Sequence, residues 1–329
     1  GAGNDVIVVV DGASFVDGGD GDDELWLVPQ SRAAASLSYA SLTAAGGTLD
    51  LVARSVGQKL ADQMAQSVLV ENRLGAGGNV GAEVVAKATP DGYTIGWVHQ
   101  GVLLFNPHLY SQAGYDPLRD FISITRIGTT PNILTAHPSV PIRSIKEFIS
   151  YAKAHPRKLS YSAGLAGESP QLSIEFLKLV TKIDVAHIPY KVAAQGISDT
   201  IGGQIPFNSS NMPSVVGHVQ SGRLRGLAVT SATRASQLPQ VPTMQESGVS
   251  RYEVTSWYGL CTPANTPAAI TDKLYADYTT VLRMPDVQQR LDELGVTTSP
   301  MTSSEFEQFI RSEIARWAQV IKEAGIPQQ

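Results

Sequence analysis

The fold is decided by the stretch Val70-Glu-Asn-Arg-Leu-Gly-Ala-Gly-Gly-Asn-Val-Gly-Ala-Glu83 and the turn that follows it. Residues 67–71 form the short apolar run of a buried strand, and the glycines then lead into an apolar helix over 80–88. Pro90-Asp-Gly92 ends that helix, and a second strand is predicted over 93–98. The stretch therefore predicts a strand–helix–strand unit of the kind that builds parallel sheets.

Strands and helices keep alternating on both sides of this unit. An amphipathic helix is predicted over 50–64, with apolar residues at helical spacing behind Asp50. Long alternation predicts an α/β fold whose parallel sheets are covered by helices on both faces, and ligands of such sheets bind at the carboxyl ends of the strands. The other predicted elements are strands over 133–136, 159–162, 186–189 and 224–230, and helices over 145–154, 169–180 and 193–201.

Composition excludes several classes of protein. The chain has 329 residues, 43% apolar and 17% charged, which predicts two packed domains. A formal charge of -5 argues against a nucleic-acid binder, because such proteins carry a basic excess. The single cysteine, Cys261, excludes an internal disulfide framework and a cysteine-based zinc site. No apolar run reaches about 18 residues, and no basic segment followed by an apolar one opens the sequence. We therefore expect neither a transmembrane helix nor a signal peptide in it.

Residues 1 to about 37 differ in composition from the rest. Gly1-Ala-Gly-Asn-Asp-Val-Ile7 and Gly19-Asp-Gly-Asp-Asp-Glu-Leu25 share the pattern G-x-G-x-D-x-aliphatic, two nine-residue steps apart. This resembles the calcium-binding nonapeptide repeat of secreted RTX proteins, in which aspartates ligate calcium between stacked coils. Only two copies are good, and each coil needs neighbours to complete its ion sites. We therefore favour a flexible acidic extension over a calcium roll.

Three loops are candidate ligand sites. Gly46-Gly-Thr-Leu-Asp50 precedes a helix, where backbone N–H groups suit a carboxylate or phosphate, although an ordinary capped helix start also explains it. The glycines of 75–81 have the spacing G-x-G-x-x-x-G, and no acid follows the next strand, so tight helix packing is favoured over dinucleotide binding. The loop 162–169 joins a strand to a helix, and its small residues and hydroxyls suit hydrogen bonding to a small acid.

The sequence offers no evident catalytic constellation. Ser162 is a poor nucleophile, because Ser160 occupies the place of the first glycine in G-x-S-x-G. The six histidines are never three or four residues apart, so no helix face offers a chelating pair. We therefore expect no catalytic residue, no bound metal and no cofactor.

Taken in order, these motifs resemble those of the tripartite tricarboxylate transporter substrate-binding proteins, also called the Bug family. The likeness spans about 40–326, and the ordered set is far more specific than any single motif. Besides the opening stretch, the residues that carry it are 46–54, 88–94, 106–107, 161–164, 187–191, 202–204, 222–231, 256–264 and 314–326.

The resemblance implies an α/β fold of the two-lobed periplasmic-binding-protein type (type II, Venus flytrap), with two segments that cross a hinge near His137 and near Ser256. Lobe 1 would comprise 38–137 and 256–329, and lobe 2 would comprise 138–255, after an N-terminal extension over 1–37. It implies a periplasmic solute receptor that closes on a small carboxylate in the interlobe cleft and is not an enzyme.

The resemblance also implies partners and a ligand pocket. The ligand would be a di- or tricarboxylate, an amino acid or an aromatic acid, delivered to membrane permease subunits of a tripartite tricarboxylate transporter; we expect a monomer and no nucleic-acid partner. The implied ligand-binding residues are Thr43, Ala44, Ala45, Gly46, Gly47, Thr48, His99, Gln100, Ser162, Ala163, Gly164, Gly167, Glu168, Ser169, Tyr190, Ser210 and Asn211.

Several positions depart from the family pattern. The first strand, within 35–43, has little apolar bulk and should weaken the first lobe's core. Glu168 stands where a serine is common and would repel a second carboxylate, and Ser210 stands where aspartate is common, which lowers the preference for an amino group. Gln171 stands where a histidine is common. The identity of the acid is therefore open.

Two other functions remain as alternatives. One is a small-molecule hydrolase or NAD-dependent enzyme on a similar α/β frame, although the missing nucleophile motif and ribose-binding acid count against it. The other, weaker still, is a calcium-dependent secreted module led by the N-terminal repeats.

Overall fold

The computed structural model describes residues 48–73, 75–164, 167–190, 192–326 and 328, and the backbone of 37–41. The glycine- and aspartate-rich repeats and residues 43–47 of the predicted first loop lie outside the described residues. The chain divides into two compact units. Unit 1 comprises Gly1–Thr129, Trp257–Ala315 and Gln328–Gln329, and unit 2 comprises Thr130–Ser256 and Arg316–Pro327.

The chain passes from unit 1 to unit 2 between Thr129 and Thr130 and returns to unit 1 between Ser256 and Trp257. Arg316–Pro327 belongs to unit 2, in which the guanidinium of Arg316 stacks 4.9 Å from the ring centre of Phe176.

The sheet of unit 1 is built around three parallel strands. β1 (Leu37–Ser41) lies between β2 (Val68–Asn72) and β3 (Thr94–His99) and is parallel to both. β9 (Thr255–Pro263) runs antiparallel to β3, and β10 (Thr297–Thr298) runs antiparallel to the first part of β4 (Phe121–Ala136). The three parallel strands end at one edge of the sheet, which is where the sequence places two of the candidate loops.

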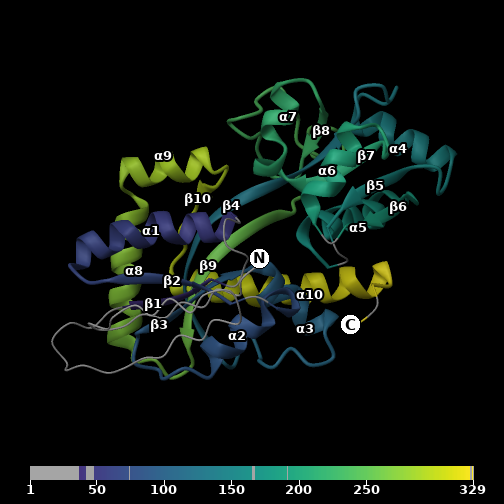
Figure 1. Ribbon diagram of the computed structural model, residues 1–329. Helices are drawn as coiled ribbons and strands as arrows, with labels where there is room; N and C mark the ends of the chain where they lie inside the picture. The colour runs from purple at the N-terminus through teal and green to yellow at the C-terminus, as the bar shows by residue number, and fades with distance from the viewer. Residues whose placement is uncertain are drawn as a thin grey trace, which may run out of the picture. The chain divides into compact units, whose positions relative to one another are not determined.

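Helices cover both faces of this sheet (Figure 1). On one face, α1, α8 and α9 share a buried apolar cluster with the strands, in which Trp97 meets Tyr278 edge to face at 6.1 Å. On the other face α2 packs so closely that a Cβ on Gly96 would lie 3.2 Å from a methyl of Val85. The helical segments are α1 (Thr48–Met64), η1 (Ala76–Gly78), α2 (Asn79–Ala86), η2 (Gly101–Phe105), α3 (Asn106–Leu109), α8 (Ala268–Leu282), α9 (Pro285–Glu293) and α10 (Ser303–Ala324), which continues into unit 2.

The sheet of unit 2 is mixed. β5 (Ser160–Ala163) is parallel to β6 (Ala186–Pro189) and to β7 (Phe207–Asn211). The second part of β4 runs antiparallel to β7 and to β8 (Arg225–Val229). The helical segments are α4 (Ile145–Ala154), α5 (Ser169–Thr181), α6 (Ala193–Ile201), η3 (Met212–Ser214) and α7 (Val216–Gln220).

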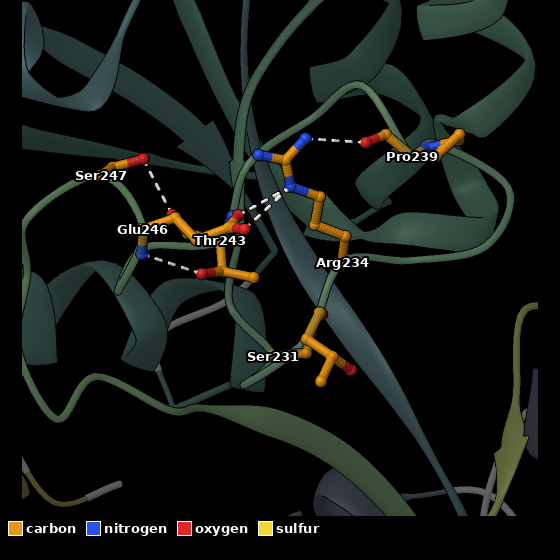
Figure 2. Close-up of polar contacts among 7 residues, drawn as sticks. Ser231, Arg234, Pro239, Thr243, Glu246 and Ser247 are labelled. Carbon is orange, nitrogen blue, oxygen red and sulfur yellow. Dashed lines mark hydrogen bonds and ion pairs between the residues drawn. The ribbon is translucent and has the colours of Figure 1, made fainter.

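A long connection follows β8 in unit 2 and is held by polar contacts (Figure 2). Thr243 and Glu246 form a reciprocal pair, in which the Glu246 N–H donates to the Thr243 hydroxyl at 3.0 Å and the Thr243 N–H donates to the Glu246 carboxylate at 2.8 Å. Arg234 donates to the same carboxylate at 2.8 Å and to the Pro239 carbonyl at 2.9 Å. Hydrogen bonding from Arg234 lowers the pKa of Glu246. These side-chain contacts therefore fix the backbone of the connection after β8.

The predicted elements are present, and the expected parallel pairing is found in both units together with antiparallel pairs. Helices 145–154 and 193–201 and strand 186–189 have the predicted bounds, and the other predicted elements shift by three residues or fewer at either end. The exception is β4, which begins at Phe121 although only 133–136 were predicted. β4 and β9 each continue from one unit into the other, so neither enters its sheet through a crossover helix, and both pair antiparallel.

Candidate functional site

The start of α1 is fixed to the end of β2 by a buried polar triad in unit 1. Asp50, 2% exposed, accepts a hydrogen bond from the Asn72 side chain at 3.0 Å and pairs with Arg54 at 3.0 Å. Arg54 also donates to the Asn72 side-chain oxygen at 2.8 Å. Because Asp50 lies in the first turn of α1, its negative charge also interacts favourably with the helix dipole. Thr48, the described end of the predicted first loop, is the first residue of this helix.

His99 is the last residue of β3, and its ring is held by the backbone that follows it. The Gly101 N–H donates to Nδ1 of His99 at 3.0 Å, so Nδ1 is an acceptor and Nε2 carries the proton. Burial lowers the pKa of His99 to about 4, so the imidazole is neutral at pH 7. A Cβ on Gly101 would lie 2.6 Å from this ring, which explains the glycine there. His99 is therefore a neutral hydrogen-bond donor.

Gln100 is part of the scaffold of unit 1. Its side-chain oxygen accepts a hydrogen bond from the Trp257 N–H, and the residue is 5% exposed. This contact ties the end of β3 to β9. Thr48 begins α1, His99 ends β3, and Gln100 directly follows β3. All three residues thus lie near the carboxyl ends of the parallel strands.

A buried carboxylate at the end of β2 was not singled out from the sequence. Glu71 is 3% exposed, and burial raises its pKa to about 7, although Arg73 opposes that shift. The only sign of it in the sequence was an acidic residue in an apolar strand. The prediction of a strand over 67–71 did not set Glu71 apart from its neighbours.

The glycine-rich loop 75–81 has a packing role. The Asn106 side chain donates to the Gly77 carbonyl at 3.0 Å and to Oδ1 of Asn79 at 2.6 Å, and the Tyr115 hydroxyl donates to the same Oδ1 at 3.0 Å. Gly77 has φ of 65°, and a Cβ there would lie 3.1 Å from the Tyr110 hydroxyl. These contacts support tight helix packing over the dinucleotide hypothesis.

In unit 2, the predicted loop at the start of α5 has both exposed and scaffold residues. The Ser162 hydroxyl is fully buried and contacts the Thr200 hydroxyl at 2.9 Å and the Asn208 amide at 2.9 Å. The Gly167 N–H donates to the Gln171 side chain at 3.0 Å. Neither group is therefore directed to a ligand.

Glu168 is an exposed residue of this loop and immediately precedes α5. Its carboxylate folds over Gly164, where an added Cβ would lie 1.9 Å from Oε2. The N-terminus of α5, which favours negative charge, thus has an acid of the chain itself beside it.

Asn132 connects two of the candidate segments of unit 2, although the sequence did not single it out. It is fully buried, and its side-chain nitrogen donates to the Ser169 hydroxyl at 3.0 Å and weakly to the Val254 carbonyl at 3.4 Å. The Ser256 hydroxyl lies 3.4 Å from Oδ1 of Asn132 and donates to Oδ1 of Asn211 at 3.0 Å. Asn132 therefore helps to bring Ser169 and Asn211 together. Nothing in the sequence marked it, because Asn132 follows Thr130 and Pro131 and lies just outside the strand predicted over 133–136.

Two further candidates of unit 2 are oriented by neighbouring side chains. The Tyr190 hydroxyl donates to the Asp199 carboxylate at 2.6 Å, and this bond raises the pKa of Tyr190. Gly196 leaves room for the ring, because a Cβ there would lie 3.0 Å from it. The Ser210 hydroxyl donates to the Asn208 side chain at 2.7 Å, and Ser210 is 4% exposed, so it serves the scaffold.

Metal sites and membrane spans are both missing from the described part of the chain. It contains no group of three or more histidine, cysteine, aspartate or glutamate side chains placed to hold a metal ion. Among its described helices, none has both the length and the apolar character needed to cross a membrane.

The chain matches the tripartite tricarboxylate transporter family receptor over residues 52–326. It belongs to this family. BugT of Bordetella pertussis is 32% identical over 281 residues, which cover 85% of this chain and 86% of BugT. The family resemblance predicted from the ordered motifs is thereby confirmed.

Solved structures show the same fold. Rpa4515 of R. palustris, solved with adipate, is 32% identical with a TM-score of 0.80, and the match covers 91% of this chain and 100% of that one. MatC of Rhodopseudomonas palustris, solved with bound malate, is 28% identical with a TM-score of 0.74 and coverage of 87% and 98%. The chain therefore has the predicted two-lobed type II periplasmic-binding-protein fold, and its relatives are receptors, not enzymes.

Proposed function

We propose that this protein is a periplasmic solute receptor that binds a small carboxylate and delivers it to the permease of a tripartite tricarboxylate transporter. The observation that carries the proposal is the match to Rpa4515, which covers 91% of this chain and 100% of that one and was solved with adipate. MatC, solved with malate, supports the same ligand class. Adipate and malate are both dicarboxylates, so dicarboxylates are the first acids to test.

The local geometry in each unit supports a site for an acid. In unit 1, neutral His99 offers an N–H, and the buried Asp50 triad fixes the start of α1. In unit 2, Tyr190 and Asn211 are oriented by neighbours, and the loop around Gly164 joins β5 to α5. Neutral donors and backbone N–H groups suit a carboxylate without requiring a cationic side chain.

The residues proposed to contact the ligand divide into two kinds. Ser162, Gln100 and Ser210 would contribute through their backbone or by supporting the loops, because their side chains are hydrogen-bonded within the chain. The Gly167 N–H and the Tyr190 hydroxyl are likewise committed, so these two residues would contribute through their other atoms. The remaining predicted residues are retained as proposed contacts: Thr43, Ala44, Ala45, Gly46, Gly47, Thr48, His99, Ala163, Gly164, Glu168, Ser169 and Asn211.

Two measurements test the ligand. Mass spectrometry identifies any acid released from the purified protein, and calorimetry then compares monocarboxylates with dicarboxylates, adipate and malate included. Gly47→Trp should abolish binding by filling the first loop. Gly217→Trp is the matched control, since a Cβ there would meet no atom within 4 Å beyond its chain neighbours and the backbone of its own helix. Turnover of an ester or nicotinamide substrate without carboxylate binding would overturn the proposal.

Delivery is tested separately from binding. The purified receptor should stimulate uptake of its labelled acid into vesicles that contain the permease subunits. Equal uptake with the receptor and with its Gly47→Trp variant would contradict a delivery role while leaving the binding result standing.

A further inference from the structure

A buried chain of polar side chains on α5 ends at the candidate ligand loop of unit 2. The Gly167 N–H donates to Oε1 of Gln171 at 3.0 Å, and Nε2 of Gln171 donates to Oε1 of Glu175 at 3.2 Å. Lys178 pairs with the other carboxylate oxygen of Glu175 at 2.8 Å. Gln171, Glu175 and Lys178 have the three- and four-residue spacing that places them on one helix face. We call these contacts the Gln171 relay.

The orientation of the Gln171 amide is forced by its two partners. A backbone N–H can only donate, so Gln171 must present its oxygen to Gly167; a carboxylate can only accept, so it must present its nitrogen to Glu175. Gln171 is 3% exposed and Glu175 is 6% exposed, so water cannot readily replace either bond. The relay therefore has a single satisfied arrangement.

The relay also reaches the other end of the loop. The Tyr161 hydroxyl donates to Oε1 of Glu175 at 3.3 Å, and the His187 ring stacks on Tyr161 with centroids 5.3 Å apart. His187 in turn contacts the Gly164 carbonyl through Nε2 at 3.0 Å. Gly164 and Gly167 are thus both tied to Glu175, and Gly167 is held at φ of 92°, where glycine is favoured.

We propose that Gln171 is a positioning residue for ligand binding: it holds Gly164 and Gly167, described residues of the candidate loop, in the conformation that receives the ligand, without touching the ligand itself. The inference rests on the proposed function and goes beyond it by naming the group that preorganises the loop. Ordering a loop costs conformational entropy, and the relay places that cost in folding instead of in binding. Loss of the relay should therefore weaken affinity and speed ligand release, with little effect on the rest of α5.

The test compares three variants of the full chain. Gln171→Leu keeps approximate size but removes both hydrogen bonds. Ser173→Ala is the matched control: its hydroxyl, fully buried on the same helix, donates to the Pro170 carbonyl at 2.7 Å and is no part of the relay. Gln171→His is the rescue, because at pH 8 a neutral imidazole has one acceptor and one donor nitrogen.

Adipate is the probe, and three quantities are measured at pH 8. These are its Kd by calorimetry, its release rate by stopped flow, and amide exchange of the peptide 160–172 by mass spectrometry. Gln171→Leu should weaken adipate binding by about 10-fold, mainly through faster release, and raise loop exchange, as expected for a buried hydrogen bond that is lost. Ser173→Ala should change affinity by less than about 3-fold, and Gln171→His should recover part of the loss.

The outcomes separate the inference from the proposed function. Gln171→Leu with unchanged adipate affinity and loop exchange overturns the inference alone. An equal loss of affinity in Ser173→Ala also overturns it, because the effect would then belong to α5 in general. If the unsubstituted protein binds neither adipate nor any other of the monocarboxylates and dicarboxylates compared by calorimetry, the proposed function fails. The inference that Gln171 sets the affinity then fails with it.

Discussion

Replacing Glu71 by glutamine should stabilise the protein in alkaline solution and have little effect in acid. Burial raises the pKa of Glu71 from 4.5 to about 7 in the folded chain, a difference of about 2.5 units. At 1.36 kcal/mol for each unit, the charged form costs about 3 kcal/mol of folding free energy above pH 7. Because the folded pKa is the higher one, this destabilisation is absent below pH 4.5 and develops as pH rises to 7. A glutamine side chain has no charge to bury, so the Glu71→Gln variant should escape it.

The assay is urea unfolding at pH 4 and pH 8.5, followed by tryptophan fluorescence, for which Trp97 and Trp257 are buried reporters in unit 1. We expect Glu71→Gln to raise the unfolding free energy at pH 8.5 by up to about 3 kcal/mol. The side chain of Arg73 is 28% exposed, so water can hydrate it when its partner is neutral. Losing the ion pair should therefore cost less free energy than removing the buried charge gains. Glu83→Gln, at a half-exposed acid on α2, is the control and should change stability by less than about 0.5 kcal/mol. A loss of stability at pH 8.5, or an equal effect at both pH values, would refute the reasoning.

Three further predictions concern other parts of the chain. His99→Gln should flatten the pH dependence of stability between pH 6.5 and 4. Burial lowers the pKa of His99 to about 4, so the unfolded chain takes up the proton first as the pH falls, and the unsubstituted protein loses up to about 3 kcal/mol of unfolding free energy. Equal slopes of stability against pH in both proteins would contradict this. Phe306→Ala should destabilise unit 1 by about 3–5 kcal/mol in urea, since the ring is fully buried and meets Trp257 edge to face at 5.4 Å, whereas Phe306→Leu should cost clearly less. Asn132→Ala should lower the melting temperature, with a loss of about 1–3 kcal/mol, and weaken binding of adipate by displacing Ser169; unchanged binding would show that Asn132 supports folding alone.

Most of the local structure could be predicted because apolar periodicity and turn residues act within a few positions of one another. The helix over 193–201 and the strand over 186–189 were predicted to the residue. β4 was mostly missed, because its first part carries threonine, arginine and glycine among its apolar residues, and only its place in the sheets makes it a strand. The antiparallel pairing of β9 likewise depends on a partner, β3, that is distant in sequence.

The candidate site shows the same division. Glycines and strand ends in the sequence marked the candidate loops around Thr48 and Gly164, and the family resemblance added His99. It did not predict which hydroxyls are committed elsewhere: the Ser162 hydroxyl is buried against Thr200 and Asn208, which lie 38 and 46 residues away. Nor did it single out Asn132 or Glu71, since the role of a polar residue in a strand depends on what covers it.

The sequence by itself determined the family, the order of the elements and the positions of the loops, because ordered motifs and local periodicity are properties of the chain alone. Only the tertiary structure decided which side chains carry a proton, a buried charge or a committed hydrogen bond. His99 is neutral and Glu71 has a pKa of about 7 because other elements remove water from them. Gln171 has a forced orientation because Gly167 and Glu175 meet it from opposite ends. Desolvation and hydrogen-bond geometry depend on neighbours brought together by folding, and spacing along the chain does not contain them.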